Sequence, residues 1–265
     1  MNRKNKSLLC NFGLNIITLT IGTLLFGILL EASKSDKQLR TDIVKEYYRP
    51  LKSKEEKCSS LHMSLITTYQ SMGDDYTFLR DRYLSYKNGT GPELNSEYQQ
   101  FLTGLISDVH NKNSASSKIN NEYSACRVEL SQLQVEAALV TGTYDKISIL
   151  MKDKNHKEAA VRARFRDETL DSMIKKLPPN IANKLVDGFF DAGNLSKPID
   201  PSQDQFLTDM INDTMPEIIK IFPAIADFNV KLSLLDQNYY NRIDLVLENE
   251  ISSRFNRGIL SKLGL

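Results

Sequence analysis

Apolar side chains recur along this chain in alternating steps of four and three residues, which places them on one side of a helix. A first stripe runs without a slip from residue 44 to residue 86, and only Glu55 and His62 interrupt its apolar and aromatic character. This spacing favours packing against a neighbouring helix, knobs into holes. We expect a kink or break near Pro50, because proline lacks a backbone donor. The first stripe consists of Val44, Tyr48, Leu51, Glu55, Cys58, His62, Leu65, Tyr69, Met72, Tyr76, Leu79, Tyr83 and Tyr86.

Two later stripes have the same helical spacing. The second stripe consists of Ile119, Tyr123, Cys126, Leu130, Leu133, Ala137, Val140, Tyr144, Ile147 and Met151. The third stripe consists of Ile225, Phe228, Leu232, Leu235, Tyr239, Ile243, Val246 or Leu247, and Ile251. Residues typical of turns separate the helices at 87–96, 111–118, 178–180 and 191–202. The chain is therefore predicted to be all-α, with an elongated, coiled-coil-like helical bundle at 31–177 and a helical section at 180–265 that caps the bundle or packs along it.

Residues 8–30 form a stretch without a formal charge, long enough to cross a bilayer as a helix. A secretory signal has a shorter apolar region, followed by small residues at a cleavage site. Here the apolar run is longer, and the residues that follow it form only a weak cleavage pattern: Leu30, Glu31, Ala32 and Ser33. A buried core helix would seldom begin so close to a basic terminus. We therefore interpret 8–30 as an uncleaved single-pass anchor (a signal-anchor) and 1–7 as a short cytoplasmic tail.

The orientation of the anchor follows from the basic residues on its two sides. Arg3, Lys4 and Lys6 precede it with no acidic residue, which favours a cytoplasmic amino terminus. The flank at 31–57 is also basic, with eight Lys or Arg against six Asp or Glu. Long domains are translocated largely regardless of charge, so we expect the helical domain outside the cytoplasm, in the periplasm or the extracellular space.

Several small or polar residues within the anchor allow close contact with another helix in the bilayer. Thr18 and Gly22 are four residues apart, as are Thr23 and Gly27. The amides of Asn11 and Asn15 are able to hydrogen-bond a neighbour. The alternative is that these residues are ordinary membrane-helix composition.

Cys58 and Cys126 are the two cysteines outside the anchor, and each lies on its helix's apolar stripe. If the intervening segment at 96–110 runs antiparallel, the two long helices are parallel neighbours and the thiols can lie at the same height. An oxidising compartment would permit a disulfide between them. The alternative is two small buried core residues. A metal site is not predicted, although His62 follows Cys58 by one helical turn, because two ligands do not make a site.

A basic cluster lies at 152–168 and includes Lys157, Arg162, Arg164 and Arg166. Four acidic residues are interspersed with its cations, which favours a solvated helix face. The alternative is a docking surface for an acidic partner or for lipid headgroups. The chain's net charge is +1, and its three amino-terminal cations leave −2 for the rest, so nucleic-acid binding is not expected.

No recognisable catalytic motif is present, and the Glu-x-x-His pairs of carboxylate metal sites in helical bundles are missing. We therefore expect no enzyme activity and no cofactor. The composition, rich in Lys, Asn, Ile and Ser, is typical of an AT-rich bacterial genome. Two function classes remain. The first is a non-catalytic interaction, assembly or sensing subunit that engages a protein partner or a second copy through its heptad stripes. The second is a ligand-binding or membrane-active domain for an apolar molecule or lipid, of unknown identity.

Overall fold

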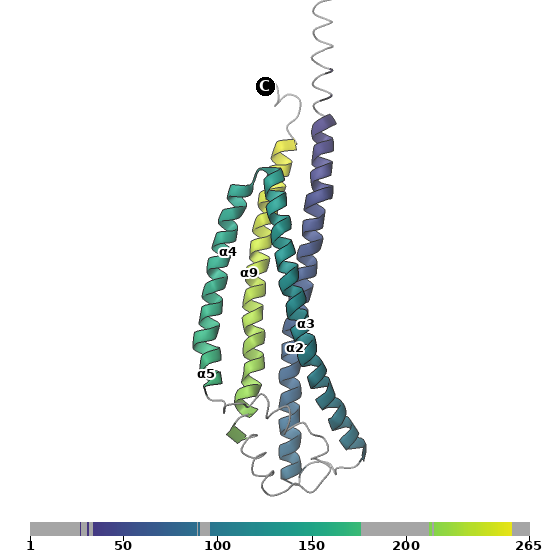
Figure 1. Cartoon of the computed structure of the whole chain (residues 1–265), viewed down its shortest axis with the longest axis vertical. Helices are drawn as coiled ribbons and strands as arrows, with labels where there is room; N and C mark the ends of the chain where they lie inside the picture. Colours follow the sequence, from purple (N-terminus) through teal and green to yellow (C-terminus); the bar gives the residue numbers. More distant parts are fainter. Residues whose placement is uncertain are drawn as a thin grey trace, which may run out of the picture. The chain divides into compact units, whose positions relative to one another are not determined.

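The computed structural model describes residues 27, 31, 34–88, 90, 96–175, 212–213 and 215–255. Every regular element among these residues is a helix (Figure 1), which confirms the all-α prediction for this part of the chain. Residues 34–43 are also helical. The elements are η1 (Val44–Tyr48), α2 (Arg49–Lys87), α3 (Ser96–Thr141), α4 (Tyr144–Arg164), η2 (Phe165–Leu170), α5 (Asp171–Ile174) and α9 (Met215–Phe255).

The predicted anchor at 8–30 lies outside the described residues except for Gly27, so the anchor remains a prediction. The predicted contact with another helix in the bilayer likewise remains a prediction, because the structure does not describe Asn11, Asn15, Thr18, Gly22 and Thr23. Gly27 is helical, and a Cβ added there would meet no atom within 4 Å. Among the helices that are described, none combines the length and apolar character needed to cross a membrane.

The chain divides into two compact units. The first contains the described residues of 1–52, 133–147 and 243–265, and the second contains those of 53–132 and 148–242. Both units are thus assembled from distant parts of the sequence. The carboxy-terminal section contributes to each of them through α9.

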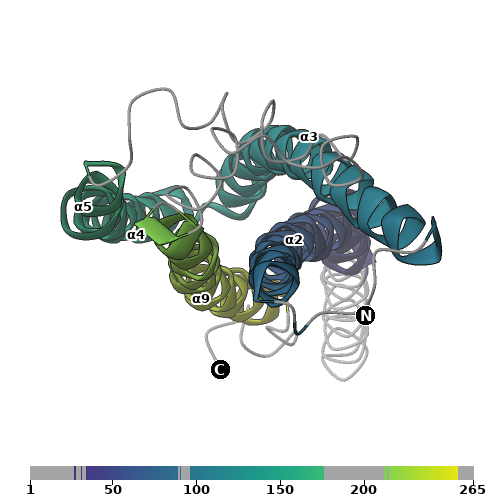
Figure 2. The same cartoon turned by 90° about the horizontal axis from the view of Figure 1, so that it is seen from below.

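In the second unit, α2, α3, α4 and α9 pack side by side (Figures 1 and 2). Residues 58 and 75 of α2 contact residues 126 and 112 of α3, so these helices are antiparallel. Residues 62 and 76 of α2 likewise contact residues 229 and 222 of α9. Seen from below, α9 lies next to both α2 and α4. The carboxy-terminal helix therefore packs along the other helices, and the parallel arrangement expected for α2 and α3 is wrong.

The first stripe forms the buried side of α2 in the second unit. Its members Cys58, His62, Leu65, Met72 and Leu79 are all buried. The helix continues through Gly73, where an added Cβ would lie 3.2 Å from the Cβ of Phe222 on α9. Glycine at this position therefore allows α9 to approach α2 closely.

Pro50 changes the helix locally. Of the two outcomes predicted here, a kink or a break, the break does not occur. The turn before it, η1, is a π-helix, and the Arg49 N–H donates to the carbonyl of Val44, five residues earlier. Proline has no N–H and clashes with the carbonyl four residues before it. The wider π turn gives the ring space, and the helix continues as α2.

We expected the second stripe to lie on one helix, but it extends over two, α3 and α4. The chain turns at Gly142, which has a φ of 71°. The N–H of Thr143 donates to the carbonyl of Ala138, and that of Gly142 to the carbonyl of Leu139, which is the Schellman pattern of a helix end. As a result, two predicted stripe members near the turn, Val140 and Tyr144, are exposed.

The turn predicted at 111–118 is also wrong, because α3 is helical throughout this segment. Ser116 is buried, and its hydroxyl donates to the carbonyl of Asn113 at 2.8 Å. A hydroxyl bonded to its own helix in this way is compatible with the helix interior. Tertiary packing therefore overrides the local turn preference of this polar segment.

Replacing Gly142 by alanine should destabilise the protein by about 1 kcal/mol, because an L side chain disfavours this left-handed backbone conformation. Gly104→Ala is the matched control: this residue is helical, and an added Cβ meets no atom within 4 Å. The control should be neutral or stabilising. Urea unfolding of the two variants measures the difference, and equal effects would contradict the role assigned to Gly142.

Candidate functional site

Four of the buried polar side chains of the second unit lie on α2 and α9. Glu55 and His62 lie on α2, Asn229 and Asp236 lie on α9, and all four are less than 9% exposed. A buried polar group without a partner is destabilising, so each position requires a compensating interaction. The two pairs have the same spacing: seven residues separate the polar residues on each helix.

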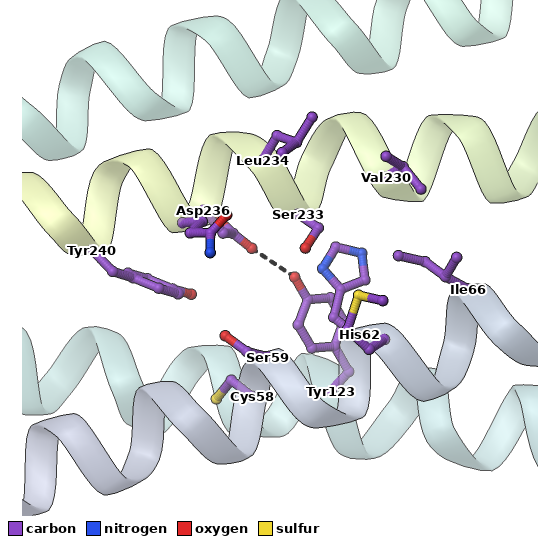
Figure 3. Close-up of a pocket in the computed structure, with 12 residues that line it drawn as sticks. Cys58, Ser59, His62, Ile66, Tyr123, Val230, Ser233, Leu234, Asp236 and Tyr240 are labelled. Atoms are coloured by element: carbon purple, nitrogen blue, oxygen red, sulfur yellow. Dashed lines mark hydrogen bonds between the residues drawn. The ribbon is translucent and has the colours of Figure 1, made fainter.

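The carboxylate of Asp236 joins three helices. Its Oδ2 accepts a hydrogen bond from the hydroxyl of Tyr123 on α3 at 2.7 Å (Figure 3). Its Oδ1 lies 2.6 Å from Nζ of Lys154 on α4. Both side chains of this ion pair are largely buried. The interaction therefore sets the rotation of α9 relative to α3 and α4.

A second carboxylate, that of Glu158 on α4, extends these contacts. Arg127 of α3 donates to both of its oxygens, at 3.0 and 2.6 Å, and Arg162 donates to Oε1 at 2.7 Å. Burial alone would raise the pKa of Glu158, but the hydrogen bonds from the two guanidinium groups outweigh it and lower the pKa to about 2. The side chain is therefore ionised at every physiological pH. We call Tyr123, Arg127, Lys154, Glu158 and Asp236 the polar layer.

His62 packs directly on the polar layer. Its ring is stacked on that of Tyr123 with the centroids 4.4 Å apart. The Nδ2 of Asn229 donates to the carbonyl of Ile225 at 2.8 Å. Asn229 Oδ1 therefore faces His62 Nε2, 3.3 Å away, and assigns the proton to that nitrogen.

The imidazole of His62 is held neutral. Burial lowers its pKa below 6.5, although the hydrogen bond to Asn229 and the charge of Asp236 act in the opposite direction. Burial likewise raises the pKa of Tyr123 and Tyr240 well above the ordinary value, so both phenols remain protonated. The neutral side chains of His62, Tyr123 and Tyr240 therefore lie near the carboxylate of Asp236, whose charge is balanced by Lys154.

A pocket of about 270 Å³ opens between α2 and α9 at the level of His62 (Figure 3). His62, Tyr123 and Asp236 contribute polar surface to its lining. Apolar side chains from both helices also line it: Met63, Ile66, Val230 and Leu234. An apolar concave site with a few convergent polar groups is typical of a ligand site.

A disulfide between Cys58 and Cys126 lies one helical turn from His62. The Cα atoms are 5.6 Å apart, both residues are buried, and Cys58 also lines the pocket. Of the two interpretations of these cysteines, the structure contains the bonded one. It joins antiparallel helices, so the parallel geometry from which the pairing was inferred was wrong. Since this sulfur is bonded, Cys58 and His62 do not form a pair of metal ligands, and no cluster of three metal-binding side chains occurs among the described residues.

The basic cluster at 152–168 is locally balanced. Each of its four candidate docking residues forms an ion pair within its own helical segment: Lys157 with Asp153, Arg162 with Glu158, Arg164 with Glu168, and Arg166 with Asp167. This arrangement is typical of a solvated helix face. Docking of an acidic partner or of lipid remains a prediction that these contacts do not test.

Sequence reasoning missed Asn229 and two members of the polar layer, Arg127 and Asp236. It assigned Lys154 and Glu158 only to the basic cluster at 152–168. The third stripe was assigned to Phe228 and Leu235, one residue earlier in each case. The available signal was the shared spacing of seven residues, because Asn229 and Asp236 on α9 match Glu55 and His62 on α2.

Asp236→Ala should destabilise the protein by about 3 kcal/mol, because it leaves the ammonium of Lys154 buried without this carboxylate. Asp227→Ala on the same helix removes an exposed ion pair with Lys231 and should change stability by less than about 0.5 kcal/mol. Chemical denaturation measures both values. A partial recovery in Asp236→Leu with Lys154→Met would show that the charge pair, and not packing, causes the loss.

Stability should fall on acidification between pH 6.5 and the lower pKa of folded His62, because the unfolded chain takes up a proton there that the native state excludes. The fall is at most about 1.4 kcal/mol per pH unit. Unfolding free energies from pH 7.5 to 5 should lose this dependence in His62→Gln and retain it in His156→Gln, where the residue is exposed. Unchanged pH dependence in His62→Gln would contradict the assignment.

No protein family model, no curated protein and no solved structure matches the chain.

Proposed function

We propose that this protein is a non-catalytic sensing subunit, anchored by residues 8–30, whose helical domain lies outside the cytoplasm and binds a small molecule between α2 and α9. The observation that carries the proposal is the pocket beside His62, which combines apolar walls with a polar base. A helical domain that only holds a partner needs no such cavity.

The location outside the cytoplasm is supported by the Cys58–Cys126 disulfide. Disulfides persist in oxidising compartments and are rare in the cytosol. The uncharged stretch at 8–30 and the basic residues before it support a single-pass anchor with a cytoplasmic amino terminus. These features agree with one another, although they come from separate parts of the chain.

Binding is favoured over assembly through the heptad stripes because several stripe positions are already occupied. In the second unit, Leu65 and Met72 of α2 and Leu232 and Tyr239 of α9 are buried within the chain. Such residues are not available to a partner helix in this fold.

An assembly or interaction subunit is the second candidate function. It is favoured by the apolar side chains exposed beside the turn between α3 and α4, where Leu139 is 61% exposed and Tyr144 is 47% exposed. Exposed apolar groups that lie together are a common feature of protein interfaces.

The location is tested with carboxy-terminal reporter fusions in a bacterial host. An alkaline phosphatase fusion should be active, a cytoplasmic fluorescent reporter should be dark, and the protein should stay in the membrane fraction.

The disulfide is tested on non-reducing gels, which should show a mobility shift that Cys58→Ala abolishes. Removing the bond should lower stability by about 4 kcal/mol for a loop of this length. An inactive phosphatase with a fluorescent reporter and two reactive thiols would overturn the proposed location.

A further inference from the structure

The α2–α9 pocket has the dimensions of a site for a small ligand. Its volume of about 270 Å³ lies just below the range of roughly 300–1,000 Å³ typical of small-molecule sites. Ile66, Val230 and Leu234 provide apolar surface, and the thioether of Met63 is able to contact the edge of an aromatic ring. The occupant is therefore compact, with a ring or a short apolar body.

The charges around the pocket disfavour a charged occupant. Asp236 is the sole charged side chain among the residues that line it, all of which are described. Both oxygens of this carboxylate are engaged, by Tyr123 and Lys154 at 2.7 and 2.6 Å. A bound anion would meet no cation in the lining, and a bound cation would compete with Lys154 for the carboxylate.

Several polar groups in the lining have hydrogen-bonding capacity that the protein does not use. Ser59 on α2 and Ser233, Gln237 and Tyr240 on α9 face the pocket, and within the described residues their side chains make no hydrogen bond. Three of them are labelled in Figure 3, from both sides of the pocket. Tyr240 is only 7% exposed. Ser233 is half-buried, whereas Ser59 and Gln237 are exposed. A ligand bonded to Tyr240 and Ser233 would therefore satisfy the two polar groups of this set that water reaches least.

We propose that the pocket between α2 and α9 binds a small uncharged molecule with a ring or short apolar body and one or two hydroxyl, amide or carbonyl groups. This inference rests on the proposed function, since it names the ligand class of the same site. The apolar walls receive the body of the ligand. The hydroxyls of Ser59, Ser233 and Tyr240 are the partners for its polar groups.

Phenol is the probe for this ligand class, and benzoate and benzylamine are its charged counterparts with the same ring. The three compounds are titrated into the purified full chain in nanodiscs at pH 7.5, with saturation-transfer NMR and calorimetry. Phenol should bind saturably. Benzoate and benzylamine should each bind at least about tenfold more weakly, because their charges have no available partner.

Ser233→Phe fills the pocket from α9 and should abolish the saturable phenol signal. Asn241→Phe is the matched control, since it adds the same ring to an exposed position of the same helix, and should bind like the wild type. Tyr240→Phe removes one hydroxyl and should weaken phenol by roughly three- to tenfold. Circular dichroism and melting curves verify folding, and Ser59→Leu fills the pocket from α2 if Ser233→Phe does not fold.

Two results would overturn the inference. Equal phenol binding by the wild type and a folded pocket-filling variant would exclude this pocket as the site. Binding of benzoate or benzylamine as tightly as phenol would exclude an uncharged ligand class. Neither result bears on the membrane location, which the reporter fusions test independently.

Discussion

The interior of the second unit depends on the carboxylate of Asp236 on α9. This carboxylate accepts a hydrogen bond from the Tyr123 hydroxyl on α3 and forms an ion pair with the Lys154 ammonium on α4. Apolar packing alone would allow α9 to slide by about seven residues, because apolar residues recur along its stripe at that spacing and the same side of the helix stays buried. A buried charge does not tolerate such a shift, since its partners lie at fixed places on two other helices. The ion pair thus specifies one register among many that hydrophobic burial would accept.

The same constraint explains why a pocket is found beside the polar layer. The ring of Tyr123 stacks on His62 and its hydroxyl donates to Asp236, so these two contacts hold the ring in the centre of the second unit. Smaller residues, Ser59 and Ser233, occupy the adjacent positions on α2 and α9. These short side chains do not fill the space between the helices, and the site is a direct result of where large and small residues fall around one buried charge.

The hydrophobic pattern predicted the helices well and the connections less well. Leu51, Cys58, Leu65 and Met72 follow the first stripe and are buried, because a long helix has one periodicity and the core selects one side of it. The turn at Gly142 was missed because the stripe continues in phase across it, and 111–118 was misassigned because polar residues suit both a turn and an exposed helix. The spacing of seven residues marks Asn229 and Asp236 as a matched pair, but the sequence does not show which residues of the other helices are their partners.

The disulfide joins α2 to α3, whereas the pocket opens between α2 and α9, and this has a dynamic consequence. Cys58 and Cys126 bond α2 covalently to α3, whereas the described contacts between α2 and α9 are noncovalent. Separation of α9 from α2 should therefore be easier than separation of α3 from α2, because the crosslink restricts only the second pair. A ligand in the pocket would contact both α2 and α9, so its binding would restrict the movement of α9 away from α2.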